Sequence, residues 1–348
     1  MNCLLLGYYE PPVGGVAVHV KRLATKLSEM GYPTRVLDFS GVPKSAANVR
    51  VVWPGIYECL RALRGESRSL AEKSVVHVHA CNFDNLQWAL PALRLWFAKH
   101  ARILTIHGGS FVARHQGVVE TLRVRAVLSG FHSVITVNAE QRGFLESLRL
   151  SRIELHTIPA YIASVPNPRN VPPGVTDRIS GRICVLSSGW AMPVYNFEPL
   201  IRAIEVLERE RYFWILALYD KYDAQYERMI ATRLGNRENV LILRDMCSEA
   251  FAAILAASNI YVRTTLVDGD SVAIREALSL GKTVLATDCV CRPGACELFK
   301  AGDSAGLVKL IQEYRRPARC SGSEDQHNER DIARVYCSTG RRLWPQCA

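Results

Sequence analysis

The chain has 348 residues, 49% of them hydrophobic and 22% charged, and its formal net charge is +10 at pH 7. This length exceeds what one ordinary hydrophobic core needs, so two domains are expected. No run approaches the ~20 apolar residues of a membrane-spanning helix, which argues against an integral membrane protein. The eleven cysteines form no CxxC pair, and no histidine or cysteine set has zinc-ligand spacing, so no metal is expected.

The positive charge is concentrated in residues 1–165, which hold 19 Lys and Arg against 11 Asp and Glu, a balance of +8. Such a basic half fits an acidic membrane surface, a phosphorylated acceptor or nucleic acid, and equally fits a plain solvated surface. No zinc finger, RNA-binding aromatic motif or basic helical stripe is present, so no nucleic-acid partner is expected. Residues 86–100 fit either a helix that covers a sheet or one that touches a membrane through Trp88, Leu95 and Trp96.

The first residues give an expectation about location. The apolar run Met1–Gly7 has the length of a strand and lacks a basic leader. Reduced cysteines without a secretory signal are typical of cytoplasmic proteins. We therefore expect a cytoplasmic protein, with a peripheral position at the inner membrane face as the membrane-bound alternative.

Apolar runs of strand length alternate with helical patterns along the N-terminal half. A helix is predicted over Val18–Met30, with Gly31 as its stop signal. The predicted strands lie near Cys3–Tyr8, Thr34–Phe39, Val75–His79, Ile103–His107, Val134–Val137 and Leu155–Ile158.

The C-terminal half repeats this alternation. Its predicted strands are Ile183–Ser187, Phe213–Leu218, Val240–Leu243, Ile260–Thr264 and Thr283–Ala286. Its predicted helices are Phe197–Glu210, Ala224–Leu234, Ser248–Ala257, Val272–Leu280 and Ser304–Tyr314. Strands rich in Val, Ile and Leu with helices between them predict parallel sheets covered on both faces, and hence an α/β protein with two Rossmann-like domains.

The domain boundaries follow from composition. Residues 1–165 form the N-terminal domain, and residues 183–315 form the C-terminal domain. Residues 166–182 gather prolines and a glycine without helical periodicity, which is typical of a linker. Residues 316–348 are polar and read as an irregular tail, in which only Asp331–Tyr336 suggests a helix that returns to the N-terminal domain.

The most informative motif is the frame from Asp268 to Glu276, because it follows a strand and opens a helix. A helix N-terminus offers free backbone N–H groups and a positive dipole end, which suit a phosphate. Glu276 lies about one and a half turns further on and suits the hydroxyls of a ribose or sugar. A purely structural interpretation stays open, since the helix dipole alone favours Asp268 and Asp270, and Arg263 or Arg275 could pair with a partly buried Glu276.

The N-terminal domain offers two loops at strand ends. Gly14 and Gly15 open the first helix and allow close approach to a ligand, although the GxGxxG fingerprint is absent. His77 and His79 share one strand face, for which packing is the favoured role over metal binding. His107 closes a strand before two glycines, so we expect it at a ligand-facing edge.

At this point the residues resemble the retaining glycosyltransferases of family 4 (glycosyl transferases group 1), which have the GT-B fold. The frame looks like that family's E-x7-E motif, with Asp268 in place of the first Glu. Gly14-Gly15, His107-Gly108, Ile135–Asn138 and Ile158-Pro159 also fall where the family has matching elements, so the resemblance spans roughly residues 3–315. It implies two Rossmann-like domains facing a central cleft.

The resemblance also implies roles for individual residues. His107 would stand near the transferred sugar, Asp268 would contact sugar hydroxyls, and Glu276 would hold the donor ribose. The substrate-binding residues would be Gly14, Gly15, Arg263, Gly269, Asp270, Ser271, Val272, Glu276 and Arg292. The chain departs from the family at Trp190 and Tyr195, near the places of two basic residues that grip the diphosphate; Arg263 or Arg292 is the candidate replacement.

The leading functional hypothesis is sugar transfer with retention, from a nucleotide-diphosphate sugar to a hydroxyl acceptor. The acceptor would be a saccharide or a lipid-linked molecule, as in polysaccharide or glycolipid synthesis, and neither a cofactor nor a required metal is expected. The alternatives are a sugar-nucleotide epimerase and a non-catalytic sugar-nucleotide-binding or scaffold protein. A nicotinamide dehydrogenase is disfavoured because its glycine fingerprint is missing.

Overall fold

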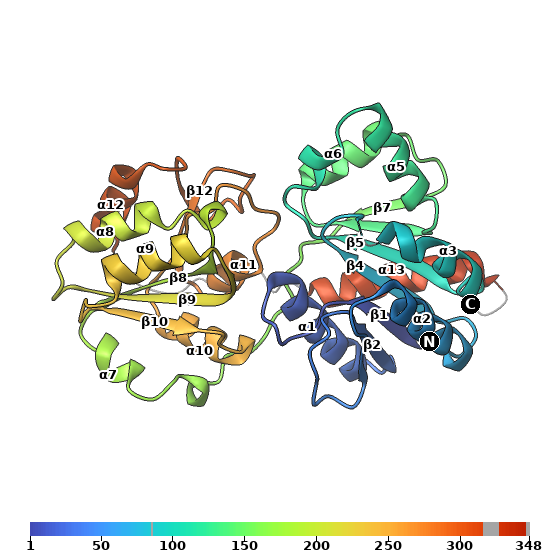
Figure 1. Ribbon diagram of the computed structural model, residues 1–348, viewed down its shortest axis with the longest axis horizontal. Helices are drawn as coiled ribbons and strands as arrows, with labels where there is room; N and C mark the ends of the chain where they lie inside the picture. The colour runs from blue at the N-terminus through green and yellow to red at the C-terminus, as the bar shows by residue number, and fades with distance from the viewer. Residues whose placement is uncertain (85, 316–326, 346–348) are drawn as a thin grey trace. The chain divides into compact units, whose positions relative to one another are not determined.

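The computed structural model describes residues 1–84, 86–315 and 327–345 (Figure 1). The chain divides into two compact units. Unit 1 comprises Met1–Ile162 and His327–Ala348, and unit 2 comprises Ala163–Gln326. The chain therefore leaves unit 1, builds the whole of unit 2 and then returns to unit 1.

Unit 1 is built on a seven-stranded parallel sheet with the strand order β3-β2-β1-β4-β5-β6-β7. Every neighbouring pair in this sheet runs parallel, as the apolar strands predict. The strands are β1 (Cys3–Gly7), β2 (Thr34–Asp38), β3 (Val49–Val51), β4 (Val75–Ala80), β5 (Ala101–Ile106), β6 (Ser133–Thr136) and β7 (Glu154–Thr157).

Helices cover both faces of this sheet. Successive strand residues point to opposite faces, so Leu4 and Leu5 of β1 enter different cores. One face packs against α2, α3, α4, α5 and α6, and the other against α1 and α13. The helices are α1 (Gly15–Glu29), α2 (Ile56–Ser69), α3 (Leu86–Trp96), α4 (Phe111–Arg114), α5 (Val118–Leu128), α6 (Ala139–Ser147) and α13 (Asn328–Leu343).

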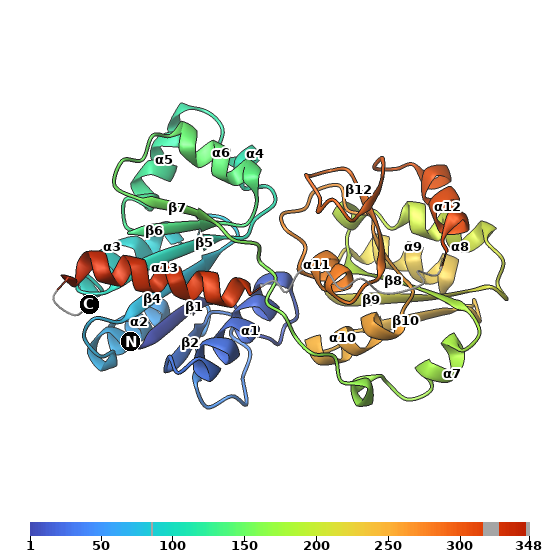
Figure 2. The same cartoon turned by 180° about the vertical axis from the view of Figure 1, so that it is seen from behind.

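The last helix differs from the irregular tail that composition suggests. Residues 328–343 form α13, whose Ile332, Val335 and Tyr336 are buried against the α1 face of unit 1. Figure 2 shows α13 running across the strands of this sheet. The amide of Asn328 also donates to the carbonyl oxygen of Tyr161 at 2.7 Å, which ties the start of α13 to unit 1. The part of the expected tail at 316–326 lies outside the described residues.

Unit 2 is built on a six-stranded parallel sheet with the order β10-β9-β8-β11-β12-β13. The strands are β8 (Ile183–Ala191), β9 (Tyr212–Tyr222), β10 (Val240–Arg244), β11 (Ile260–Arg263), β12 (Thr283–Thr287) and β13 (Glu297–Phe299). One face packs against α8, α9 and α12, and the other against α7, α10 and α11. These helices are α7 (Val175–Ile179), α8 (Glu198–Val206), α9 (Ala224–Leu234), α10 (Ser248–Ala257), α11 (Val272–Ser279) and α12 (Ser304–Glu313).

The predicted α/β class with two Rossmann-like domains is confirmed, and local differences have simple causes. β3 and β13 escape prediction because three residues are too short for a visible pattern. The expected linker 166–182 contains a 3-10 turn at Pro168–Asn170 and the helix α7, and Val175 is buried in unit 2. Proline fits the first turn of a helix, so the prolines here do not prevent local order.

The amphipathic stretch at 86–100 forms α3, and its apolar face covers the sheet. Leu90, Leu93 and Phe97 are buried, and Leu95 is exposed. The side chain of Trp88 lies outside the described residues. In the portions of the chain that the structure describes, no helix has the length and hydrophobicity needed to cross a membrane.

Candidate functional site

The topology marks one ligand-binding edge in each unit. In open parallel sheets, ligands bind beyond the carboxyl ends of the strands, where the strand order reverses. This reversal falls between β1 and β4 in unit 1 and between β8 and β11 in unit 2. In unit 2, the carboxyl end of β11 leads directly into the Asp268–Glu276 frame. In unit 1, β1 leads into the glycine loop, and β4 ends beside His79.

The second half of the frame is the helix α11. Ser271 is its N-cap, and the Ser271 hydroxyl accepts a hydrogen bond from the backbone N–H of Ile274 at 3.4 Å. The remaining N–H groups of the first turn have no intrahelical carbonyl partner, because helix geometry supplies none. The N-terminus of α11, which begins at Val272, therefore offers free N–H donors and the positive end of the helix dipole, and both favour an anion.

Glu276 lies inside α11 and is 2% exposed. Its Oε1 accepts a hydrogen bond from the hydroxyl of Ser164 at 2.9 Å. Ser164 is 112 positions away in sequence and belongs to the same unit. A buried carboxylate needs such donors, because burial without hydrogen bonds is costly. Glu276 is thus more deeply buried than the partial burial that its apolar flanking residues predict.

The Asp268 carboxylate is the centre of a dense polar network. Arg263 donates from Nε to Oδ2 at 3.0 Å and from Nη2 to Oδ1 at 3.2 Å. Arg292 donates from Nη1 to Oδ2 at 3.0 Å. The hydroxyl of Thr265 and the backbone N–H of Gly269 complete the set at 3.2 and 3.1 Å. A carboxylate has about four lone-pair positions, so these five donors saturate the hydrogen-bonding capacity of Asp268.

The electrostatics of this network follow from its burial. Burial by itself would raise the pKa of Asp268, but Arg263 and Arg292 outweigh it and lower that pKa to about 2. Burial by itself would lower the pKa of Arg263, and Asp268 more than compensates, so that pKa is raised. Asp268 and Arg263 are therefore charged at neutral pH. With the guanidinium of Arg292, the network contains two cations and one anion, a net charge of +1.

Tyr195, one of the two positions where the chain departs from the family that it resembles, contributes to the same network. The guanidinium of Arg263 lies over the ring of Tyr195, 5.1 Å from its centroid, and Arg263 Nη1 donates to the carbonyl oxygen of Ser188 at 3.1 Å. A Cβ atom at Gly189 would lie 2.0 Å from the Tyr195 ring, so this position requires glycine. The ring of Tyr195 thus makes a cation–π contact with Arg263, which is the last residue of β11.

The other frame residues lie in the same loop. Asp270 accepts a hydrogen bond from Nε of Arg275 at 2.5 Å. Arg263 and Arg275, which the sequence offers as partners for Glu276, pair here with Asp268 and Asp270. Arg292 comes from the segment after β12; its Nε donates to the carbonyl oxygen of Thr287 at 3.1 Å. Unit 2 therefore brings together Arg263, Asp268, Gly269, Asp270, Ser271, Val272, Glu276 and Arg292 from the predicted set.

The remaining predicted site residues lie in unit 1. Gly14 is the N-cap of α1, and a Cβ atom at Gly14 or Gly15 would meet nothing within 4 Å, so both face open space. His107 follows β5, and its Nε2 lies 3.1 Å from Nδ1 of His79. A Cβ atom at Gly108 would lie 1.9 Å from the carbonyl oxygen of Cys81, which explains the glycine after His107.

Sequence reasoning missed several residues of these two groups. Ser164 and Thr265 carried no signal, because isolated hydroxyl residues occur throughout any chain. His19 lies in α1 and approaches His79 and His107 in space. Its distance in sequence from them hides this proximity, and only the packing of α1 on β4 reveals it.

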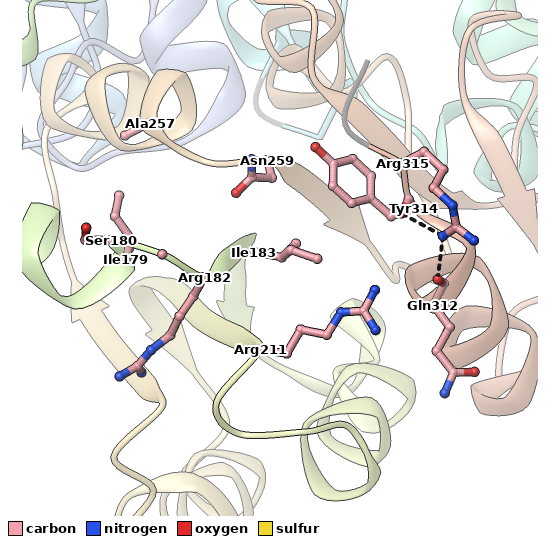
Figure 3. A pocket seen from close by; sticks show the side chains of 11 residues that line it. Ile179, Ser180, Arg182, Ile183, Arg211, Ala257, Asn259, Gln312, Tyr314 and Arg315 are labelled. Atoms are coloured by element: carbon pink, nitrogen blue, oxygen red, sulfur yellow. Dashed lines mark hydrogen bonds between the residues drawn. The ribbon is translucent and has the colours of Figure 1, made fainter. Parts of the chain in front are cut away.

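A cavity of about 720 Å³ lies at the other edge of the unit 2 sheet (Figure 3). Arg182, Arg211 and Asn259, which line it, directly precede β8, β9 and β11. They therefore stand at the amino ends of these strands, away from the frame. None of the predicted site residues lines this cavity.

A comparison with protein families finds a match to the C-terminal portion of the chain. Residues 175–310 match the family described as "Glycosyl transferases group 1". This range contains the complete Asp268–Glu276 frame together with Arg263 and Arg292. A comparison with curated proteins found no match to the chain.

Solved structures share the whole fold. A trehalose-phosphate synthase from Burkholderia xenovorans is 13% identical, with a TM-score of 0.70 and coverage of 98% of this chain and 99% of that one. The pneumococcal O-GlcNAc transferase GtfA is 9% identical, with a TM-score of 0.70 and coverage of 99% of each chain. HepE from Anabaena is 16% identical, with a TM-score of 0.64 and coverage of 100% and 99%.

These matches agree with the two parallel sheets described above. The similarity extends over nearly the full length of each chain, so it includes both units and the return of α13. The chain therefore has the GT-B fold of two Rossmann-like domains, and its residues 175–310 form a glycosyl transferases group 1 domain.

Proposed function

We propose that the protein is a retaining glycosyltransferase of the family 4 type, which transfers a sugar from a nucleotide-diphosphate sugar to a hydroxyl acceptor. The supporting observation is the placement of Glu276. This carboxylate is buried on α11, close to the anion-binding end of the same helix. One short segment thus offers hydrogen-bond acceptors for a ribose and N–H donors for a diphosphate.

The donor would be bound through groups of opposite character. Glu276 would accept from the ribose hydroxyls, and the backbone around Ser271 and Val272 would donate to the diphosphate, with Gly269 and Asp270 shaping the loop. Arg263 and Arg292 would supply the positive charge that the family takes from the positions of Trp190 and Tyr195. Fixed donors and cations of this kind stabilise a leaving diphosphate, so we propose that transfer needs no metal at this position.

Retention would follow from attack on the same face as the leaving group, with a diphosphate oxygen taking the acceptor proton. A covalent nucleophile is disfavoured, because the Asp268 carboxylate already accepts five hydrogen bonds. In this geometry the Asp268 carboxylate holds the two arginines. For Asp268 to contact sugar hydroxyls, as the resemblance implies, a sugar hydroxyl would have to replace one of its five hydrogen-bond donors. We therefore propose Asp268 as the residue that positions both cations.

Unit 1 would bind the acceptor, with Gly14 and Gly15 near the diphosphate and His107 near the transferred sugar. Its excess of positive charge favours an anionic saccharide or a lipid-linked acceptor at the inner face of a membrane, in polysaccharide or glycolipid synthesis. The start of α5 adds an apolar surface, since Val118, Val119 and Leu122 are exposed there. Such a surface beside basic residues suits a peripheral membrane contact.

Structures of similar fold suggest which donor to try first. Anabaena HepE is described in complex with UDP and glucose, and pneumococcal GtfA with UDP and GlcNAc. We propose a UDP-sugar donor on that basis. At identities of 16% and 9%, these neighbours support the choice of a first ligand and leave the sugar to be measured.

The first prediction concerns Glu276. The full chain is heated with each member of a panel of nucleotide sugars and nucleoside diphosphates, and its Tm is recorded. A ligand at about 100 times its Kd should add about 2.7 kcal/mol to the free energy of unfolding. We expect a selective increase in Tm for the wild-type chain and its loss in Glu276→Gln, which keeps the size of the side chain and removes its charge.

A matched control is Ser164→Ala, which removes the hydroxyl donor and leaves the Glu276 carboxylate in place. This variant should retain a ligand-induced increase in Tm, because the ribose hydroxyls can replace the lost donor. The proposal fails if no ligand raises the Tm of the wild-type chain, or if Glu276→Gln folds and keeps the full increase.

A second candidate function is sugar-nucleotide binding without transfer. The replacement of the usual basic residues by Trp190 and Tyr195 favours it, because Arg263 already pairs with Asp268. Product analysis separates the two functions. Transfer to an acceptor, or slow hydrolysis of the donor, supports the enzyme, whereas selective binding without any turnover across an acceptor panel supports the binding protein.

A further inference from the structure

Histidine side chains gather on the α1 face of the unit 1 sheet, at its carboxyl edge. His77 and His79 alternate along β4 and therefore point to the same face. His107 follows the neighbouring strand β5, and His19 comes from α1, which packs over β4. The rings of His19, His79 and His107 contact one another, with centroids 4.9 to 5.4 Å apart, and His77 contacts His79 at 4.1 Å.

One of these rings has a structural role. His77 shares a hydrogen bond with the hydroxyl of Tyr336 through Nδ1 at 2.6 Å and with the hydroxyl of Thr105 through Nε2 at 2.7 Å. Both nitrogens are therefore occupied, and one of them ties β4 to α13. His77 fits the packing role that its strand position predicts.

His19 has the opposite arrangement. Its Nδ1 lies 2.5 Å from the carbonyl oxygen of Ala160, and a carbonyl only accepts, so Nδ1 carries the proton. Nε2 of the neutral ring then presents a lone pair. This nitrogen is buried and has no hydrogen-bond partner among the described residues. A histidine held by a backbone carbonyl through one nitrogen, with the other free, has the usual orientation of a metal ligand.

His79 and His107 complete the group. Nδ1 of His79 and Nε2 of His107 are 3.1 Å apart. Two nitrogens bound to one tetrahedral zinc ion at 2.0–2.1 Å would be about 3.3 Å apart. One nitrogen from each of His19, His79 and His107 lies within 4.8 Å of the others, so small ring rotations bring all three to one ion. The second nitrogen of His79 is also buried without a partner among the described residues.

We propose that His19, His79 and His107 bind one divalent transition-metal ion of the zinc type. Imidazole nitrogens suit zinc, cobalt, nickel and copper and disfavour magnesium and calcium. Three protein ligands leave a fourth position, which a water molecule or a sugar oxygen can take. This ion would lie in unit 1, so it does not replace the arginines proposed for the diphosphate in unit 2.

The protonation state of the cluster favours this assignment. Burial, opposed by the hydrogen bond to Ala160 and assisted by the charge of nearby Arg22, lowers the pKa of His19 to about 4. Burial, followed by the neighbouring histidines, lowers the pKa of His79 and of His107 well below the ordinary value. All three rings are neutral at pH 7, and the neutral form is the one that binds a metal.

The experiment uses the full chain, stripped with EDTA and dialysed, and titrated with Co²⁺ and then with competing Zn²⁺. We expect one equivalent of Co²⁺ to produce the visible absorption of a tetrahedral ion, without the near-ultraviolet band of a cobalt–thiolate bond. Zn²⁺ should abolish this absorption, and elemental analysis should give one zinc per chain. No saturable binding, or a thiolate band, overturns the proposal.

The decisive variant is His19→Asn. The asparagine amide can still donate to the Ala160 carbonyl, and it removes only the free nitrogen. We expect the Kd for Co²⁺ to increase by at least 10–100-fold, the loss seen even when only a residue that hydrogen-bonds to a metal ligand is removed. His107→Asn, at a half-buried position, gives a second test if His19→Asn does not fold. His327→Asn, at an exposed histidine, is the matched control and should bind normally.

The cobalt titration contains no nucleotide sugar, and the donor test depends on Glu276 in unit 2. A failed cobalt titration therefore leaves the nucleotide-sugar proposal untouched.

Discussion

At the scale of single residues, Asp268 makes a prediction about stability. Its folded pKa is about 2, below the ordinary value of 3.8, so its charged form stabilises the fold above about pH 4. This contribution is lost only as the pH falls from about 4 towards 2. Asp268→Asn should therefore lower the free energy of unfolding by about 2 kcal/mol, equally at about pH 7 and pH 5, in urea titrations.

Glu198→Gln is the matched control for this variant. Glu198 also pairs with an arginine, Arg233, at 2.6 Å, but its side chain is 42% exposed, whereas that of Asp268 is 10% exposed. Solvent screens an exposed pair, so this control should cost no more than about 1 kcal/mol. An equal cost in both variants would contradict the view that burial makes the Asp268 network strong.

At the scale of elements, the N-cap of α11 is predicted to serve binding as well as stability. Ser271→Ala removes the cap and should cost about 1 kcal/mol of stability. It should also weaken nucleotide-sugar binding, because the first turn of α11 becomes less ordered. Binding is measured by calorimetric titration at a temperature where the variant is fully folded.

Asp223→Ala tests the same kind of cap at α9. The Asp223 carboxylate accepts from the backbone N–H of Tyr226 at 2.8 Å, and α9 carries none of the frame residues. This variant should lose similar stability and bind normally. If both variants weaken binding alike, the effect of Ser271→Ala reflects general loosening of unit 2.

The elements also show what a sequence can reveal. The helix Ala224–Leu234 and the strand Cys3–Gly7 were predictable from the spacing of apolar residues and from the residues that begin or end an element. Both signals lie within a short stretch of sequence. The Asp268–Glu276 frame stands out for the same reason, since its strand, loop and helix are contiguous. Each of these features lies within one short stretch of chain.

Features that depend on distant packing were not predictable. The hydrogen bond from Ser164 to Glu276 spans 112 positions, and Tyr336 reaches His77 across 259. The helix α13 is rich in charged residues, so its buried stripe is hidden until a surface of unit 1 is available to cover it. His19 was overlooked because the sequence does not show which residues lie near a single helical histidine in the folded protein.

At the scale of the whole molecule, the two units should respond differently to acid. Unit 1 buries His19, His77, His79 and His107, whose pKa values are all lowered, first by burial. The unfolded chain therefore binds more protons below pH 6.5, and stability falls as the pH drops towards 4. His19 alone should cost about 2 kcal/mol between about pH 6.5 and pH 5.

Scanning calorimetry of the metal-free chain at about pH 7, 6 and 5 measures this effect. The transition that belongs to unit 1 should shift to lower temperature with acid, and His19→Asn should reduce the shift. Unit 2, whose Asp268 titrates near pH 2, should change less. Parallel shifts of both units, unchanged in His19→Asn, would show that the buried histidines do not govern the response.

The return of α13 to unit 1 sets the order in which the chain can fold during its synthesis. Residues 1–162 emerge from the ribosome first, yet the partners of Tyr161 and His77 lie at Asn328 and Tyr336. At about 5–20 residues per second, the nascent sheet waits roughly ten to thirty seconds for them. Unit 2 is continuous in sequence and needs no such wait. The half of the protein that is translated first is therefore the half that is completed last.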